Sequence, residues 1–195
     1  MHIGEPLPAF TKGDGKLNTV DTVSVRHGNN DFQNRSRLTA DEFFAACERG
    51  SANALIPMLK FYNELSIRGP VTTERWVPST SLSQFVARWV MPIDSTNSDP
   101  IHFIWLDHQY SWRKVASNLW INATNMMVKD HPSKTHAMLC AWEYAQAKYE
   151  QTPVFHEVQQ SVCGKQRHYA KAIVPLFDKT GNVIKLLNFS QPLQC

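Results

Sequence analysis

Two side chains that can take part in chemistry, His136 and Cys140, lie four residues apart in a segment expected to be helical. Residues at this spacing share one face of a helix. A histidine in such a position suits the axial site of a haem iron. A helical histidine is more often a packed or surface residue, however, and without a Cys-x-x-Cys-His run covalent haem attachment is not expected.

The remaining histidines do not predict a zinc site, which needs about four converging ligands. His156 and His168 fall on neighbouring expected strands. A turn at Gly164–Lys165 would place His168 opposite about Ser161 and away from His156. We therefore expect scattered histidines, at the surface or satisfied by neighbouring groups, and no metal centre.

The order Asp107, His108, Ser111 suggests hydrolase chemistry. The sequence has no Gly-x-Ser-x-Gly elbow, and residues this close in one loop seldom form a catalytic triad. It also lacks the glycine-rich motifs that bind phosphate. One enzymatic alternative stays open: a curved sheet and helices that enclose Asp107, His108 and His136 in a cleft with perturbed titration.

Tryptophans concentrate in the middle of the chain and favour a buried position. A ligand pocket is also mostly apolar with a few polar groups, so the same side chains would line one. The residues expected to line such a pocket are Trp105, His136, Trp142, Ala172 and Asn188.

These residues depend on a C-terminal antiparallel meander, predicted from β-branched and aromatic runs separated by glycine-containing turns. The expected strands are Pro153–Val162, Arg167–Phe177 and Val183–Phe189. Side chains alternate between the faces of a strand, so Lys171 should share a face with Tyr169 and Ile173.

Small residues on the other face of the middle strand, Ala170 and Ala172, leave room for a helix or a ligand. Asn188 is expected to point inward, where its amide needs a hydrogen-bond partner from the backbone or from a ligand.

The best helix is expected over Ser133–Tyr149. Its spacing predicts an apolar stripe toward the core and a polar face toward water. The stripe comprises Met138, Trp142, Ala145 and Tyr149, and the polar face comprises Lys134, Glu143, Gln146 and Glu150.

Two helices are expected earlier in the chain. Thr39 and Glu42 form a capping box, and Gly50 ends that helix. Apolar residues at helical spacing follow, until Gly69-Pro70. Segment Ser81–Ile93 is expected to be a short helix leading into a strand.

Two strand predictions remain. Ile101–Asp107 is expected to be a strand because of its β-branched and aromatic content, and Thr19–Arg26 a short edge strand.

Composition narrows the class of protein. The chain has 195 residues, 43% of them hydrophobic, and a net charge of +3 without a basic run, so nucleic acid is not an expected partner. No apolar run approaches the roughly 20 residues that span a bilayer, and the N-terminus lacks the features of a signal peptide. Four cysteines without a Cys-x-x-Cys pair favour free thiols and a cytoplasmic location.

The order of the expected elements resembles a PAS domain. The chain looks most like a bacterial stand-alone PAS family in which an N-terminal helix ends in an Arg-Gly element, here Arg68-Gly69. The run Arg167–Asp178 and the following Gly181-Asn182-Val183-Ile184 also resemble this family. The resemblance covers about Ala54–Ser190, but Trp105–Asn125 has no glycine where family members carry a Gly-Arg-Asp-like turn.

This resemblance implies an α+β fold with an antiparallel sheet of about five strands, flanking helices and an N-terminal helical extension. Residues 1–37 are rich in Gly, Asn, Asp, Thr and Pro and are expected to be a flexible or arm-like segment. Residues 38–70 would be the N-terminal helices and 71–195 the sensory domain. The implied function is non-catalytic signalling: a small ligand or a signalling protein would bind, without a membrane, and act through a helix-mediated interface in a homodimer. No cofactor is required, although PAS domains can carry haem or flavin. The remaining alternative is a structural dimerisation module whose N-terminal arm is exchanged between subunits.

Overall fold

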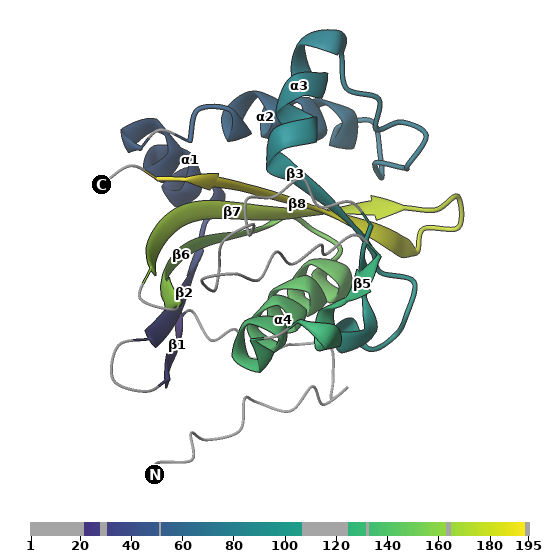
Figure 1. Cartoon of the computed structure of the whole chain (residues 1–195). Coiled ribbons are helices and arrows are strands. Elements are labelled where there is room, and N and C mark those ends of the chain that lie inside the picture. The colour runs from purple at the N-terminus through teal and green to yellow at the C-terminus, as the bar shows by residue number, and fades with distance from the viewer. Residues whose placement is uncertain are drawn as a thin grey trace.

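One antiparallel sheet of eight strands, with α-helices on both faces, forms the part of the chain that the computed structural model describes, residues 22–27, 31–50, 52–106, 125–131, 133–162 and 165–193 (Figure 1). The strand order is β1-β2-β6-β7-β8-β3-β4-β5. The strands are β1 Thr22–His27, β2 Asp31–Leu38, β3 Val90–Asp94, β4 Ile104–Trp105, β5 Met126–Met127, β6 Val154–Val162, β7 Lys165–Phe177 and β8 Val183–Pro192. The α-helices are α1 Ala40–Arg49, α2 Leu55–Ser66, α3 Thr80–Trp89 and α4 Lys134–Glu150. The predicted α+β class is confirmed, and the sheet is larger than the five strands expected.

The C-terminal meander is confirmed, with β6, β7 and β8 paired as antiparallel neighbours. The predicted register between β6 and β7 was wrong by two residues, because His168 lies opposite Gln159 and not Ser161. Val162 pairs with Lys165, which moves the turn one residue toward the N-terminus. His168 still lies away from His156, and its Nε2 is 2.6 Å from Glu157 Oε1.

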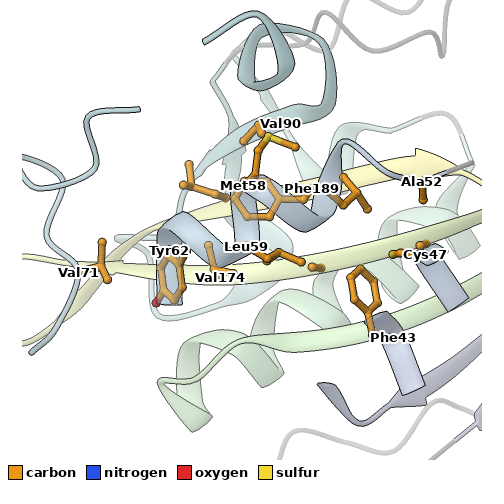
Figure 2. Packing of buried hydrophobic residues seen from close by; sticks show 14 of the residues in the cluster. Phe43, Cys47, Ala52, Met58, Leu59, Tyr62, Val71, Val90, Val174 and Phe189 are labelled. Atoms are coloured by element: carbon orange, nitrogen blue, oxygen red, sulfur yellow. The ribbon is translucent and has the colours of Figure 1, made fainter. Parts of the chain in front are cut away.

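The two faces of the meander alternate as predicted. Ala170, Ala172 and the alternate residues after them pack against α1 and α2, where Phe43, Met58, Leu59 and Phe189 fill the core (Figure 2). Ile173 lies on the opposite face, in a second core beneath α4. The room above the alanines is therefore occupied by helices of the same chain, and α4 closes the other face (Figure 1).

The capping box at the start of α1 is present: the Thr39 hydroxyl accepts from the Glu42 amide, and the Glu42 carboxylate accepts from the Thr39 amide. Gly50 ends this helix as expected. Helix α2 carries Tyr62, whose hydroxyl crosses to β7 and donates to the Pro175 carbonyl at 2.9 Å. This bond ties the helical layer to the sheet.

Replacing Tyr62 with Phe should lower the free energy of unfolding by about 1 kcal/mol, because it removes a buried hydrogen bond and keeps the ring. Urea denaturation measures the change. Tyr149→Phe is the matched control, since that hydroxyl also donates to a backbone carbonyl, of Ser98, but the residue is 52% exposed. We expect the control to cost only a few tenths of a kcal/mol; equal losses in both variants would contradict the assignment.

The described part of the N-terminal segment belongs to the sheet. β1, an edge strand close to where one was predicted, pairs with β2, and β2 pairs with β6 of the same chain. Residues 31–38 were not predicted to be a strand. They carry only two apolar residues, Phe32 and Leu38, and the sequence pattern gave no sign that the polar residues between them are buried.

The predicted strand Ile101–Asp107 was wrong over most of its described part. Pro100–His102 forms a 3-10 turn, which Asp99 caps by accepting from the Ile101 amide, and only Ile104–Trp105 extends as β4. Proline at the first helical position favours this turn because it has no amide hydrogen to satisfy. The predicted helix-to-strand segment Ser81–Ile93 is confirmed as α3 followed by β3. Within the described residues, no helix is long and apolar enough to cross a membrane.

Candidate functional site

Polar side chains, and not apolar ones, fill part of the contact between α4 and the sheet. On the sheet they occupy alternate positions of neighbouring strands. Between β2 and β6, Gln33 lies opposite Gln160 and Arg37 lies opposite His156. Between β6 and β7, His156 lies opposite Lys171. Arg35 lies between Gln33 and Arg37 on the same face of β2. We call these buried polar residues the interior cluster, and each is at most 5% exposed. It comprises Gln33, Arg35, Gln160 and Lys171 of the sheet and His136, Cys140 and Glu143 of α4.

Glu143 is the centre of the interior cluster. Its Oε1 lies 3.1 Å from Arg35 Nε, and its Oε2 accepts from Lys171 Nζ. The Arg35 contact is an ion pair without hydrogen-bond alignment, since neither Nε nor Oε1 has a hydrogen-bond partner among the described residues. Two strands are thus joined to α4 through a single carboxylate.

Electrostatic attraction keeps this network ionised despite complete burial. For Glu143, burial raises the pKa, but Lys171 and Arg35 outweigh it, and the net pKa falls below its usual value. For Lys171, burial lowers the pKa, yet Cys140 and Glu143 raise it above its usual value. The carboxylate and the ammonium group are therefore both charged near neutral pH.

The guanidinium of Arg35 is otherwise surrounded by uncharged acceptors. Its Nη2 donates to Gln33 Oε1 at 3.2 Å and to His136 Nδ1 at 3.3 Å, and both Nη1 and Nη2 lie 3.3 Å from Gln160 Oε1. Burial, followed by the positive charge of Arg35, keeps the pKa of His136 well below its usual value. His136 is consequently neutral.

These contacts fix the tautomer of His136. Arg35 can only donate, so Nδ1 must be the unprotonated nitrogen and Nε2 must carry the hydrogen. Nε2 lies 3.3 Å from Cys140 Sγ and therefore donates to the sulfur. A nitrogen that already carries its proton cannot take one from the thiol, so this pair does not form a nucleophile and its base.

Burial raises the pKa of the Cys140 thiol, although Lys171, with its Nζ 4.0 Å from the sulfur, lowers it. Cys47 and Cys140 are both buried, and neither forms a disulfide, in agreement with the free thiols expected. Cys163 and Cys195 lie outside the described residues.

Of the residues predicted to line a pocket, only His136 belongs to the interior cluster. Trp105 is its near neighbour: the Trp105 indole packs edge-on against the His131 ring, and His131 packs against His136 with ring centroids 4.8 Å apart. The Trp105 Nε1 donates to the Tyr144 hydroxyl at 3.0 Å.

The other three predicted residues are not members of the interior cluster, and only Ala172 lies on the other face of the sheet. Trp142 packs with Leu139 and Val25 and has its ring 5.8 Å from that of His156. Asn188 Oδ1 accepts from Ser190 Oγ at 3.1 Å, so a side chain of its own strand is a partner of this amide. Ala172 lies on the opposite face of the sheet, beneath α1 and α2, and cannot line a space with His136. Asp107 and His108 of the enzymatic alternative lie outside the described residues.

The predicted orientation of α4 was correct for Trp142 and Ala145, which are buried, and for Lys134, which is exposed, but it was wrong for four other residues. Glu143 and Gln146, expected to face water, are 0% and 2% exposed, whereas Met138 and Tyr149 of the expected core stripe are 45% and 52% exposed. Gln146 is buried because its Oε1 lies 3.2 Å from His156 Nε2. Buried partners on the sheet, which helical periodicity does not take into account, explain why Glu143 and Gln146 face inward.

A surface hollow of about 240 Å³ lies beside β3 and β4, apart from the residues of the interior cluster. It is lined by Asp94, Thr96, Asn97, His102, Ile104 and Met127. Among the described residues no group of three or more His, Cys, Asp or Glu side chains is arranged to hold a metal ion.

No protein-family model matches the chain, and no curated protein or solved structure shows significant similarity to it. The geometry of the interior cluster is therefore the basis for assigning a function to the chain.

Proposed function

We propose that this protein is a non-catalytic, PAS-type sensory domain that binds a small ligand between α4 and the sheet and signals through a helix-mediated interface. The observation that supports this most strongly is the fully buried Arg35–Glu143–Lys171 network. A buried ion pair adds little stability compared with apolar side chains of similar size. Strongly perturbed ionisable groups in an interior are instead typical of functional sites.

The network gives α4 a means of responding. Glu143 and His136 of α4 contact Arg35 of the sheet, and Glu143 also contacts Lys171. A ligand that interacts with these charges changes the free energy with which α4 packs on the sheet. Binding that favours one packing arrangement shifts the population toward it, and a partner or second subunit can detect the displaced helix.

The arrangement of His136 and Cys140 supports a binding role over a catalytic one. The pair resembles a nucleophile with its base, but the tautomer that Arg35 imposes leaves His136 without a free lone pair toward the sulfur. Both residues are also at most 5% exposed.

Native mass spectrometry of the full chain, purified without denaturation, tests the proposal together with amide hydrogen exchange. We expect a small-molecule adduct, and faster exchange in α4 once extensive dialysis has removed it. The amides of α1 are the internal reference, because α1 packs on the opposite face of the sheet. The ligand-binding proposal would be contradicted if no adduct forms and α4 exchanges identically before and after dialysis.

A further inference from the structure

The interior cluster holds more positive than negative charge. Arg35 and Lys171 are cationic, and Glu143 is the only carboxylate paired with either of them among the described residues. His136 beside Arg35 is neutral. Among the described residues, one positive charge therefore remains without a counter-charge, on side chains that are at most 3% exposed, and burying such a charge is unfavourable without a further anion.

The uncompensated charge is located at the Nη edge of Arg35. This edge suits the two oxygens of a carboxylate, but here both nitrogens share the single oxygen of Gln160 at 3.3 Å. Hydrogen bonds from a guanidinium to a charged acceptor are shorter, about 2.7–2.9 Å. The Nη edge of Arg35 therefore contacts an acceptor, the Gln160 amide, that carries no negative charge and offers only one oxygen, although the edge can bind two oxygens.

Gln160 gives an independent indication of a missing acceptor. Its Nε2 is buried and has no hydrogen-bond partner in the part of the chain that is described. Exchanging the amide oxygen and nitrogen would not help, because the nitrogen would then face the donors of Arg35. Gln160 Nε2 needs a hydrogen-bond acceptor, and the neighbouring guanidinium of Arg35 needs a negative charge. One bound anion would supply both.

We propose that the Nη edge of Arg35, together with Gln160, binds a small organic monoanion, a carboxylate of the size of formate or acetate. The carboxylate takes the Nη1 and Nη2 hydrogen bonds that Gln160 Oε1 now accepts, and the Gln160 side chain rotates to donate its Nε2 to the same anion. The deficit is one charge, which favours a monoanion over sulfate or phosphate. This inference depends on the proposed function and names the class of ligand.

Isothermal titration calorimetry and thermal denaturation with sodium acetate test the proposal, with sodium chloride at equal ionic strength as the reference. Acetate should bind saturably and raise the melting temperature by several degrees, as expected for a ligand that binds only the folded state. Binding by chloride as tight as by acetate would overturn the assignment to a carboxylate.

Gln160→Glu is the decisive variant, because it places a carboxylate beside Arg35 permanently. We expect a melting temperature above that of the wild-type protein without acetate, and an acetate dissociation constant at least about tenfold weaker. Gln159→Glu adds the same charge at the neighbouring exposed position and should leave the acetate dissociation constant unchanged. Its melting temperature should not rise, because Gln159 Nε2 donates to Glu157 Oε1 and a carboxylate there would be repelled. A Gln160→Glu protein that is less stable than the wild type, or that fails to fold, would overturn the proposal.

Cys140 is the alternative source of negative charge. A thiolate absorption band near neutral pH, lost in Cys140→Ser, would show that the cluster neutralises itself and would overturn the anion site. We expect no such band and unchanged acetate binding in Cys140→Ser. An adduct of another chemical class, found without acetate binding, would overturn this inference and leave the proposed function. Acetate binding without any change in α4 exchange would support the ligand class and contradict signalling through α4.

Discussion

Glu143→Gln should lower the free energy of unfolding by about 3–5 kcal/mol, the cost of leaving buried charges without their partner. Both Arg35 and Lys171 would lose their counter-charge at once, at a position where all three side chains are at most 3% exposed. The amide keeps the shape of the side chain, so the loss reports charge and not packing. Urea denaturation near neutral pH, followed by circular dichroism, measures it.

The matched control is Glu150→Gln, on the same helix. Glu150 accepts two hydrogen bonds from Arg37, at 2.8 and 2.6 Å, but both side chains are more than a fifth exposed. An ion pair in contact with water contributes about 0–1 kcal/mol. If the two variants lost equal stability, the interior cluster would be hydrated or Lys171 would have released its proton, and the electrostatic argument for the site would fail.

Glu143 also marks the limit of what the sequence could predict. Periodicity places charged residues outside because an unpaired charge is costly to bury, and that rule assigned Glu143 and Gln146 to water. The rule fails where partners on another element meet the charge. Those partners, Arg35 and Lys171, lie 108 and 28 residues away from Glu143 in the chain, and nothing local in α4 indicates them.

The parts of the fold that local signals determine were predicted correctly. The capping box at Thr39, the stop at Gly50 and the Asp178–Asn182 turn between β7 and β8 depend on residues a few positions apart. Pairing of β2 with β6 joins residues more than 100 positions apart. β2 has no apolar run that predicts it, and the Gly28-Asn29-Asn30 turn signal before it does not indicate β6 as its partner. Arg35, the central cation of the site, was therefore left in a segment expected to be an arm.

For the candidate site, residue type was more informative than position. His136 was singled out for the chemistry of its side chain, and it does lie in the interior cluster. Ala172 was chosen because small residues leave space, and the space proved to be filled by α1 and α2. A paired, buried charge can be recognised only once the elements that enclose it are known.

Acidification should destabilise the protein well before its carboxylates are protonated. Burial lowers the pKa of His156 to about 4, although Glu143 acts in the opposite direction. A histidine in the unfolded chain has a pKa of about 6.5. Below that pH the unfolded state binds a proton that the folded state does not, so stability is complete above about pH 6.5 and falls as the pH approaches 4. The loss from this residue alone is about 3 kcal/mol.

Urea denaturation at several pH values and constant ionic strength measures this dependence. In His156→Gln, an amide can still donate to Gln146 Oε1 but does not titrate, so between pH 7 and 4 the variant should lose about 3 kcal/mol less than the wild type. His136, whose pKa is lowered by burial and by Arg35, leaves a residual slope of the same sign. A wild-type protein equally stable at pH 7 and pH 4 would mean that His156 is hydrated, and that the space between α4 and the sheet is open to water.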